Sequence, residues 1–285
     1  MPLEPVTSHD NPTLKRLRKL RKSRERRKQG VLIAEGRREV QRAQAAGLRC
    51  ELLVTCPPLL GPHGLAEPDA ESPGAVRWIE VPAGLFETVA YHDKPEGVLG
   101  VFAEPSVGLA ELTAGRLEHG PPLVLIAVGA EKPGNLGAMV RSAEAAGAAA
   151  VLSVDGVVDP YNPNAIRNST GAVFTTPVVA CDTPAALGWA RAQGLTLVAS
   201  LASDDARSNA QACWSADLSG PLAIVVGPEA KGLPDDWAQA SDLAVTIPTL
   251  GRTVDSLNAS VAAAVLLFEA RRQREAAPTR APVPG

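Results

Sequence analysis

Three short stretches of this 285-residue chain combine glycines with hydrogen-bonding side chains. They are GAEKPGNLGAMVRSAEAAGA (129–148), GPEAKGLP (227–234) and IPTLGRTVDSLNAS (247–260). Each lies at the end of an apolar run that is typical of a buried strand. In an open parallel sheet, the carboxyl ends of the strands present loops and helix N-termini to ligands. The three stretches are therefore expected to converge on one binding site.

The first stretch carries a single arginine, Arg141, among the small and apolar residues of an expected helix. A guanidinium in such surroundings needs a partner, solvent or a ligand. Two partners remain open. One is an acid of this chain, such as Glu144 or Glu229, and the other is a phosphate, which the forked guanidinium fits well.

The other polar residues of these stretches also have two interpretations. Asn135 precedes the expected helix by one or two residues, where its side chain can cap the first turn. Ser256 and Asn258 open a long helix near the end of the chain, where they can also act as first-turn capping groups. The alternative for all three is direct contact with a ligand.

Two familiar nucleotide sites are excluded by the spacing. A P-loop requires a Lys followed by Ser or Thr after its second glycine, but Asn135 and Leu136 follow Gly134 here. No strand is followed by the G-x-G-x-x-G pattern of a dinucleotide site. The expected sheet therefore binds a different ligand.

The formal net charge of −3 conceals a strongly basic segment near the N-terminus. Its members are Lys15, Arg16, Arg18, Lys19, Arg21, Lys22, Arg24, Arg26, Arg27 and Lys28. The four cysteines show neither a CxxC pair nor a regular ladder, which indicates no metal site and no disulfide framework. No apolar run approaches the roughly 20 residues of a membrane span, and no signal-peptide core is present. A cytoplasmic protein is expected.

The elements that position these residues fall into two expected domains. Strands at 30–36, 50–56, 76–82 and 97–105, with a basic helical segment and a helix at 37–47, indicate a small α/β domain over 1–107. After a linker at 108–121, strands at 123–128, 150–154, 196–200, 222–227 and 243–248 alternate with helices from about 136, near 164 and at 257–274. This alternation predicts a parallel sheet covered on both faces, over 122–275. The last helix is expected to bury Val261, Val265, Leu266 and Phe268 on one face, in the core or in an interface, and 276–285 is expected to be a disordered tail.

In order and spacing, the three stretches resemble the motifs of the SpoU (TrmH) family of RNA 2'-O-ribose methyltransferases, which belong to the knotted SPOUT superfamily. The matching segments are EKPGNLGAMVRSAEAAG, VVGPEAKGL and IPTLGRTVDSLNASVAAAVLLFEA, with DPYNPNAIRNSTGAVFTTPV between the first two. The N-terminal TSHDNPTLKRLRKLRKSRERRKQGVLIAEGRREVQRAQAAG resembles the RNA-substrate-binding domain of two-domain members. The departures are small: Lys132, Pro133 and Gly134 replace a common Asp-Pro pair, and Ser142 replaces a common Thr.

The resemblance implies a trefoil knot in the C-terminal half, an exception to the rule that folds avoid threading. It also implies S-adenosylmethionine bound in a bent form and a homodimer with its interface beside the cofactor. The implied catalytic residues are Asn135, Arg141, Glu229, Ser256 and Asn258. The implied cofactor-binding residues are Gly227, Glu229, Gly232, Ile247, Leu250, Leu257 and Asn258. For Arg141 two roles stay open: the proton acceptor of the family proposal, or a group that binds phosphate and orients the hydroxyl, which suits a guanidinium that stays protonated.

Beside such a domain, the basic segment is expected to contact RNA phosphates through Lys15, Arg16, Arg18, Lys19, Arg21, Lys22, Arg24, Arg26 and Arg27. Aromatic residues make up only 4% of the chain, so recognition by shape and backbone is favoured over base stacking. The resemblance to the bacterial two-domain members of the family implies ribosomal RNA, of the large subunit, in preference to tRNA. Two alternatives remain: a non-catalytic RNA-binding or assembly factor on the same scaffold, and a small-molecule enzyme with a phosphorylated substrate, which the basic domain disfavours.

Overall fold

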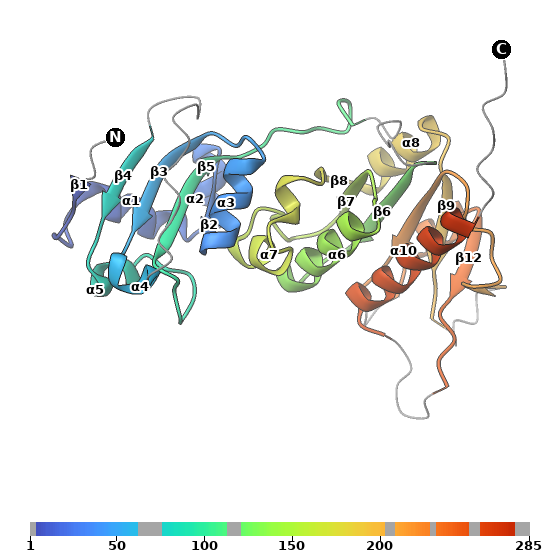
Figure 1. Cartoon of the computed structure of the whole chain (residues 1–285). Helices are drawn as coiled ribbons and strands as arrows, with labels where there is room; N and C mark the ends of the chain where they lie inside the picture. Colours follow the sequence, from blue (N-terminus) through green and yellow to red (C-terminus); the bar gives the residue numbers. More distant parts are fainter. Residues whose placement is uncertain are drawn as a thin grey trace, which may run out of the picture. The chain divides into compact units, whose positions relative to one another are not determined.

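A computed structural model describes residues 4–61, 76–112, 121–202, 209–228, 232–250 and 257–276 of the chain. Its contacts divide the chain into two compact units. The N-terminal unit comprises Met1–Ser106 and Asp159–Thr175, and the C-terminal unit comprises Val107–Val158 and Thr176–Gly285. Figure 1 shows the elements of both units in the colours of the sequence. Each unit is described by itself below.

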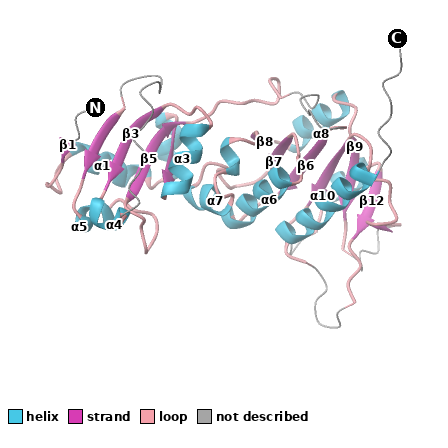
Figure 2. Ribbon diagram, viewed as in Figure 1, coloured by secondary structure: helices cyan, strands magenta, loops and turns pink. Residues whose placement is uncertain are grey.

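The N-terminal unit contains a five-stranded mixed sheet in the order β1-β4-β3-β5-β2 (Figure 2). Its strands are β1 (Glu4–Pro5), β2 (Val31–Glu35), β3 (Cys50–Thr55), β4 (Arg77–Glu80) and β5 (Val98–Ala103). Its helices are α1 (Pro12–Leu20), α2 (Ser23–Gln29), α3 (Arg37–Ala45), α4 (Pro57–Leu60) and α5 (Ala83–Glu87). Strand β5 pairs antiparallel with β2 and β3, whereas β1, β3 and β4 pair in parallel. The small α/β domain expected from the sequence is thereby confirmed.

The basic helical segment forms two helices, of which α1 is amphipathic. Asn11 caps α1 by accepting from the Thr13 N–H at 2.8 Å, and the fixed backbone of Pro12 suits the first helical position. The leucines at 14, 17 and 20 follow the spacing of one helix face and are fully buried in the core of the unit. The positive charges of α1 therefore lie on its other sides.

A segment from the middle of the chain completes the N-terminal unit. Asp159–Thr175 contains α7 (Pro163–Asn168) and a short 3-10 helix (Ala172–Phe174), and α7 packs against β2. The expected division placed this segment with the residues around it in the C-terminal domain, whereas its contacts group it with the N-terminal unit. The reason lies in its own side chains: Asp159 pairs with Arg26 of α2, and Thr170 Oγ1 accepts from Arg42 of α3 at 3.1 Å.

The C-terminal unit contains a seven-stranded sheet in the order β10-β12-β9-β11-β6-β7-β8. Its strands are β6 (Leu123–Val128), β7 (Ala150–Val154), β8 (Val178–Cys181), β9 (Thr196–Ser200), β10 (Gln211–Ala212), β11 (Leu222–Val226) and β12 (Leu243–Thr246). Every strand pair in the described part of this sheet is parallel. Strands β6, β7 and β11 are buried along their whole length, as a sheet covered on both faces requires. The expected parallel-sheet architecture is confirmed.

Helices cover this sheet on both faces. The helix α6 (Pro133–Ala145) packs beside α10 (Ala259–Ala276) over β6, β7 and β11 (Figure 1). On the opposite face, Trp189 of α8 (Thr183–Ala192) and Trp237 of α9 (Asp235–Ala240) share a core with the alternate residues Val124 and Ile126 of β6. No helix in the described parts of the chain has the length and apolar character needed to span a membrane.

Some expectations about the elements need correction. The helix after β6 begins at Pro133 instead of Leu136, because proline is well suited to the first helical position. Strand β8 and helices α8 and α9 were missed, since they are short and their apolar runs are weak. Helix α10 runs to Ala276, the first residue of the expected tail, and 277–285 lie outside the described residues. The knot involves stretches that include 229–231 and 251–256, which are also outside the described residues, so it stays a prediction.

Candidate active site

A cleft lies at the carboxyl ends of two neighbouring strands of the C-terminal unit, β6 and β11. It encloses about 650 Å³, including the part that opens to solvent. The residues that line it are Ala127, Val128, Gly129, Ala130, Glu131, Lys132, Asn135, Met139, Gly227, Pro228 and Ala259. The first two sequence stretches and the start of α10 therefore meet where the parallel sheet predicted a site.

Glycines allow the backbone segments around the cleft to approach closely. A Cβ at Gly227 would lie 2.7 Å from the Cα of Leu233 and 2.9 Å from the carbonyl oxygen of Gly232. Gly129 has a φ of +60°, and a Cβ there would lie 3.1 Å from Cγ of Pro228. A side chain at Gly227 would fill space that the folded backbone needs, and one at Gly129 would press on the Pro228 ring and strain the positive φ. Main-chain segments at Gly129–Ala130 and Gly227–Pro228 therefore line part of the cleft, as expected for a site that binds its ligand largely through backbone groups.

Asn135 and Asn258 connect the two helices that border the cleft. The Nδ2 of Asn258 donates to Oδ1 of Asn135 at 3.3 Å, across 123 positions of sequence. Asn258 also accepts from the N–H of Ser260 at 3.0 Å and thereby caps the start of α10, as its capping interpretation predicted. For Asn135 the capping interpretation is wrong, because it lies inside the first turn of α6 and the cap position is Lys132.

Arg141 lies on the exposed side of α6, so its guanidinium reaches solvent. Leu136, Met139 and Val140 turn toward the core instead. Within the described parts of the chain, the Arg141 guanidinium has no hydrogen bond or ion pair, and Glu144 is also exposed. The ion pair with Glu144 therefore does not form, which leaves the arginine available for a ligand. Its other expected partner, Glu229, lies outside the described residues.

The remaining predicted cofactor-binding residues that the structure describes are not part of the lining of the cleft. Gly232 has a φ of +65°, and its N–H donates to the Pro228 carbonyl at 3.0 Å. Ile247 and Leu257 are half-buried, and Leu250 is fully exposed. None of these four residues lines the cleft. Glu229 and Ser256 are outside the described residues, so the roles of this group stay predictions.

Sequence reasoning did not single out several residues that line the cleft, including Glu131, Lys132, Met139 and Ala259. The first two occupy the exit of β6, a strand end that the sequence already marked as a ligand-binding edge. Met139 follows Asn135 by one helical turn, so the same helix face brings both to the cleft. Their positions therefore follow from the predicted strand end and helix face, although their residue types did not indicate a role in ligand binding.

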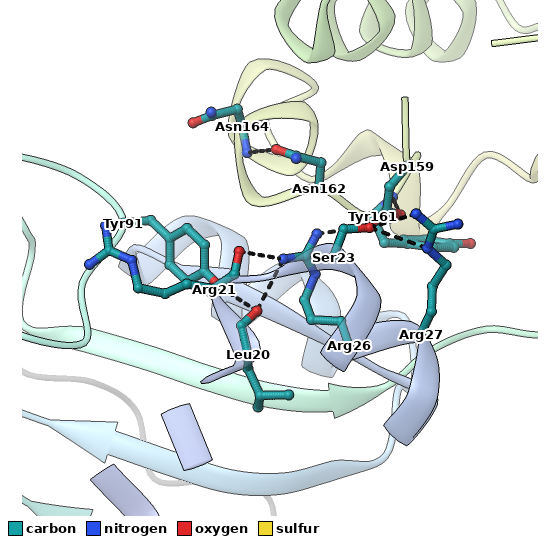
Figure 3. Close-up of polar contacts among 10 residues, drawn as sticks. All are labelled: Leu20, Arg21, Ser23, Arg26, Arg27, Tyr91, Asp159, Tyr161, Asn162 and Asn164. Carbon is teal, nitrogen blue, oxygen red and sulfur yellow. Dashed lines mark hydrogen bonds and ion pairs between the residues drawn. The ribbon is translucent and has the colours of Figure 1, made fainter. Parts of the chain in front are cut away.

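The basic segment of the N-terminal unit is only partly available to a ligand. Lys15, Lys19, Arg21, Lys22, Arg24, Arg27 and Lys28 are exposed, and Arg16 and Arg18 are half-exposed. Arg26 is fully buried, with Nη2 bonded to Oδ2 of Asp159 at 2.8 Å (Figure 3). The prediction that Arg26 contacts RNA is therefore wrong, because a buried guanidinium bonded to a carboxylate cannot reach a phosphate.

Two family models match the chain. The model of the SpoU rRNA methylase family matches residues 122–268, and that of the MRM3-like substrate-binding domain matches residues 11–100. These spans correspond to the sheet with the cleft and to the sheet with the basic segment.

The chain is also similar to individual rRNA methyltransferases from bacteria. It is 35% identical to a 23S rRNA (guanosine-2'-O-)-methyltransferase from Ralstonia nicotianae, over 74% of this chain and 82% of the relative. It is 30% identical to the 23S rRNA (uridine(2479)-2'-O)-methyltransferase of Streptomyces viridochromogenes, over 86% of this chain and 76% of the relative. A crystal structure of an AdoMet-bound rRNA methyltransferase from Sinorhizobium meliloti superposes with a TM-score of 0.82 at 30% identity, covering 95% of this chain and 98% of that one. Because the methylase model covers more than half of the sequence and the cleft lies within it, the chain belongs to the SpoU rRNA methylase family.

Proposed function

We propose that this protein transfers the methyl group of S-adenosylmethionine to a ribose 2'-hydroxyl of large-subunit ribosomal RNA. The observation that carries the proposal is the cleft at the carboxyl ends of β6 and β11, bordered by Asn135 and Asn258 and followed on α6 by Arg141, which has no partner among the described residues. Membership of the family makes the protein an RNA methyltransferase that uses S-adenosylmethionine. The relatives named above act on 23S rRNA, which supports that substrate over tRNA.

The residues of the cleft fit this cofactor. Gly227 lets the backbone of Gly232 and Leu233 pack closely against it, Gly129 has a positive φ beside Pro228, and Gly129–Lys132 line the same wall of the cleft. We assign contacts with the cofactor to this wall, to Gly227 and Pro228, and to the loop that continues through Glu229 to Gly232. When bound, S-adenosylmethionine supplies an electrophilic methyl group.

The protein side chains have to orient a weak nucleophile. A ribose 2'-hydroxyl reacts only when its oxygen is aligned with the methyl group and its proton can leave. We assign to Arg141 the binding of the adjacent phosphate and the orientation of the hydroxyl, since a guanidinium stays protonated and donates in a fixed fork. Asn135 and Asn258 hold the starts of α6 and α10 together beside this position.

The proposal is tested by transfer of labelled methyl groups from S-adenosylmethionine to unmodified 23S rRNA and to unmodified tRNA. The expected result is labelling of 23S rRNA at one ribose, recognised because a 2'-O-methyl group protects the adjacent phosphodiester from alkaline cleavage. Labelling of tRNA alone would overturn the ribosomal substrate. Label on a base, or no transfer to either RNA or to ribosomal particles despite cofactor binding, would overturn the reaction and favour a non-catalytic RNA-binding factor.

We also propose a homodimer that pairs through α10. Val261, Val265 and Phe268 have the spacing of one helix face and are 47%, 38% and 48% exposed, which supports the interface alternative for this face, whereas Leu266 is buried in the core. A stripe of exposed apolar side chains on one helix suits a second copy of the same surface. The proposed substrate places this dimer in the cytoplasm.

The double variant Val265→Asp with Phe268→Asp is expected to be monomeric, because two carboxylates would be buried without partners in the interface. Sedimentation equilibrium measures the mass of both proteins, and the wild type is expected to have the mass of two chains. Val107→Asp serves as a control, since Val107 is 39% exposed and lies outside α10. A wild-type protein with the mass of one chain, or a double variant that remains dimeric, would contradict the assignment.

A further inference from the structure

A buried polar network fixes the middle segment of the chain to α2 in the N-terminal unit (Figure 3). The Arg26 guanidinium donates to Asp159 Oδ2 at 2.8 Å and to the Leu20 carbonyl at 3.1 Å. The other carboxylate oxygen of Asp159 accepts from the N–H of Tyr161 at 2.9 Å. The backbone that leads into α7 is therefore held at a defined place beside the junction of α1 and α2.

A second set of bonds attaches the turn at Tyr91 and His92 to the same junction. The Tyr91 hydroxyl donates to the Leu20 carbonyl at 2.7 Å, which is the oxygen that also accepts from Arg26. Arg21 donates to the Ala90 carbonyl at 2.9 Å, and its guanidinium carbon lies 5.5 Å from the centre of the Tyr91 ring. Figure 3 shows Arg21 beside this ring. The exposed Arg21 side chain is thus held against the turn.

The same turn is bonded to β2 through a buried acid. Glu35, the last residue of β2, accepts from the Tyr91 N–H at 2.6 Å. Burial raises the pKa of this carboxyl, while the N–H groups of Tyr91 and His92 and the charges of Arg167 and Arg21 lower it. Both arginines therefore lie within electrostatic reach of one carboxylate, although neither forms an ion pair with it among the described contacts.

Arg167 belongs to α7, the helix that packs against β2. Its side chain is exposed, and within the described parts of the chain it makes no hydrogen bond or ion pair. Burial and the charge of Arg167 lower the pKa of His92, so the imidazole is neutral at pH 7 and the positive charge of this surface belongs to the arginines. Glu35 is buried and forms no ion pair with either arginine among the described residues, and two such exposed cations on one surface are typical of a site for an anion.

The nearby acids do not neutralise the two arginines. Glu39 is buried and bonds to Arg38 at 2.9 Å. Glu96 accepts from the N–H of Arg37 at 3.1 Å. Asp93 is exposed and acts on His92. The positive charge of Arg21 and Arg167 therefore stays available to a ligand from solution.

We propose that Arg167 and Arg21 together form a phosphate-binding site for the RNA substrate, on a surface built by α7 and the Tyr91–His92 turn. The proposal rests on the proposed function, because RNA is the polyanion that the protein has to bind. It extends the RNA-binding surface beyond residues 11–100, the span of the substrate-binding match, to a helix within the span of the methylase match. The Arg26–Asp159 ion pair positions α7 in this surface.

The test measures binding of protein-free 23S rRNA to the full-length protein as a function of salt concentration. Each phosphate contact that is lost is expected to reduce the slope of log K against log salt by about 1. Arg167→Ala and Arg21→Ala should each show this reduction, and the double variant should show about twice as much. The control is Arg77→Ala, which removes an equally exposed arginine of the same unit that bonds to Glu4. Binding of S-adenosylmethionine and the unfolding transition should be unchanged in every variant.

The outcomes separate this proposal from the function on which it rests. Reduced slopes for Arg167→Ala and Arg21→Ala, with a normal slope for Arg77→Ala, would support the site. If all three variants lose the same slope, or none does while the wild type methylates 23S rRNA, the site is wrong and the proposed function stands. A wild type that neither binds nor methylates RNA would overturn both.

Discussion

Replacing Arg141 with alanine is expected to lower the rate of methyl transfer at least about 100-fold while the fold and the affinity for S-adenosylmethionine stay unchanged. The side chain is exposed on α6 and makes no bond within the described chain, so its removal costs no internal contact. Alanine also has a high helix propensity. The loss should therefore appear in the transition state, where an oriented, charge-assisted hydrogen bond is most valuable.

Single-turnover transfer to 23S rRNA measures this effect, with Arg272→Ala as a control that removes another exposed arginine of the C-terminal unit. Arg141→Lys separates the two roles that remain open. If the residue accepts a proton, the lysine variant should gain rate as pH rises toward the range where an amine loses its proton. If the residue orients the hydroxyl and phosphate, the lysine variant should be weak at every pH, because the fork is lost. Near-normal transfer by Arg141→Ala would remove Arg141 from the mechanism.

The architecture of the C-terminal unit was largely readable from the sequence, because the central strands are nearly continuous apolar runs. Strands β6, β7 and β11 are buried on both faces, so each of them appears in the sequence as a short, continuous apolar run. Strand β8 and helix α8 were less visible. Only Val178 and Val179 of β8 are buried, and α8 is marked mainly by the Asp182 cap, whose oxygen accepts from Ala185.

The placement of individual charges was the weaker part of the prediction. All residues of α2 are polar, so nothing in SRERRKQ distinguishes the buried Arg26 from the exposed Arg24 and Arg27. Its partner Asp159 is 133 positions away, a separation that no periodicity reveals. The orientation of Arg141 was left open for a related reason: its sequence neighbours are small or apolar, and only the structure shows that Leu136, Met139 and Val140 form the buried face of α6.

The candidate site was predicted by its backbone more than by its side chains. The convergence of two strand ends with the start of α10 follows from the parallel sheet, and the cleft lies there. The contact of Asn135 with Asn258 does not follow from either sequence stretch. It depends on how α6 and α10 pack side by side, which only the assembled sheet determines.

Asp159→Asn is expected to destabilise the N-terminal unit by about 3 to 5 kcal/mol, the usual cost of leaving one charge of a buried pair without its partner. The side chains of Arg26 and Asp159 are only 2% and 9% exposed, so water cannot take over the lost interaction. Asparagine has a single acceptor oxygen: where it accepts from the Tyr161 N–H, its Nδ2 group faces Arg26, so the variant loses the charge together with the hydrogen bond from Arg26. Glu4→Gln is the control, because its pair with Arg77 is about half exposed and should contribute less than about 1 kcal/mol.

Adding Arg26→Met to Asp159→Asn tests the cause of this loss. If the cost comes from the unpaired buried guanidinium, the double variant should be more stable than Asp159→Asn alone, since the charge itself has been removed. Urea unfolding measures the free energies, and hydrogen exchange shows which unit opens. Faster exchange should appear in β2 and β5 and be absent from β6 and β11, because the pair lies in the N-terminal unit. A double variant that is less stable than Asp159→Asn would instead mean that the packing of the Arg26 stem, and not its charge, dominates at this position.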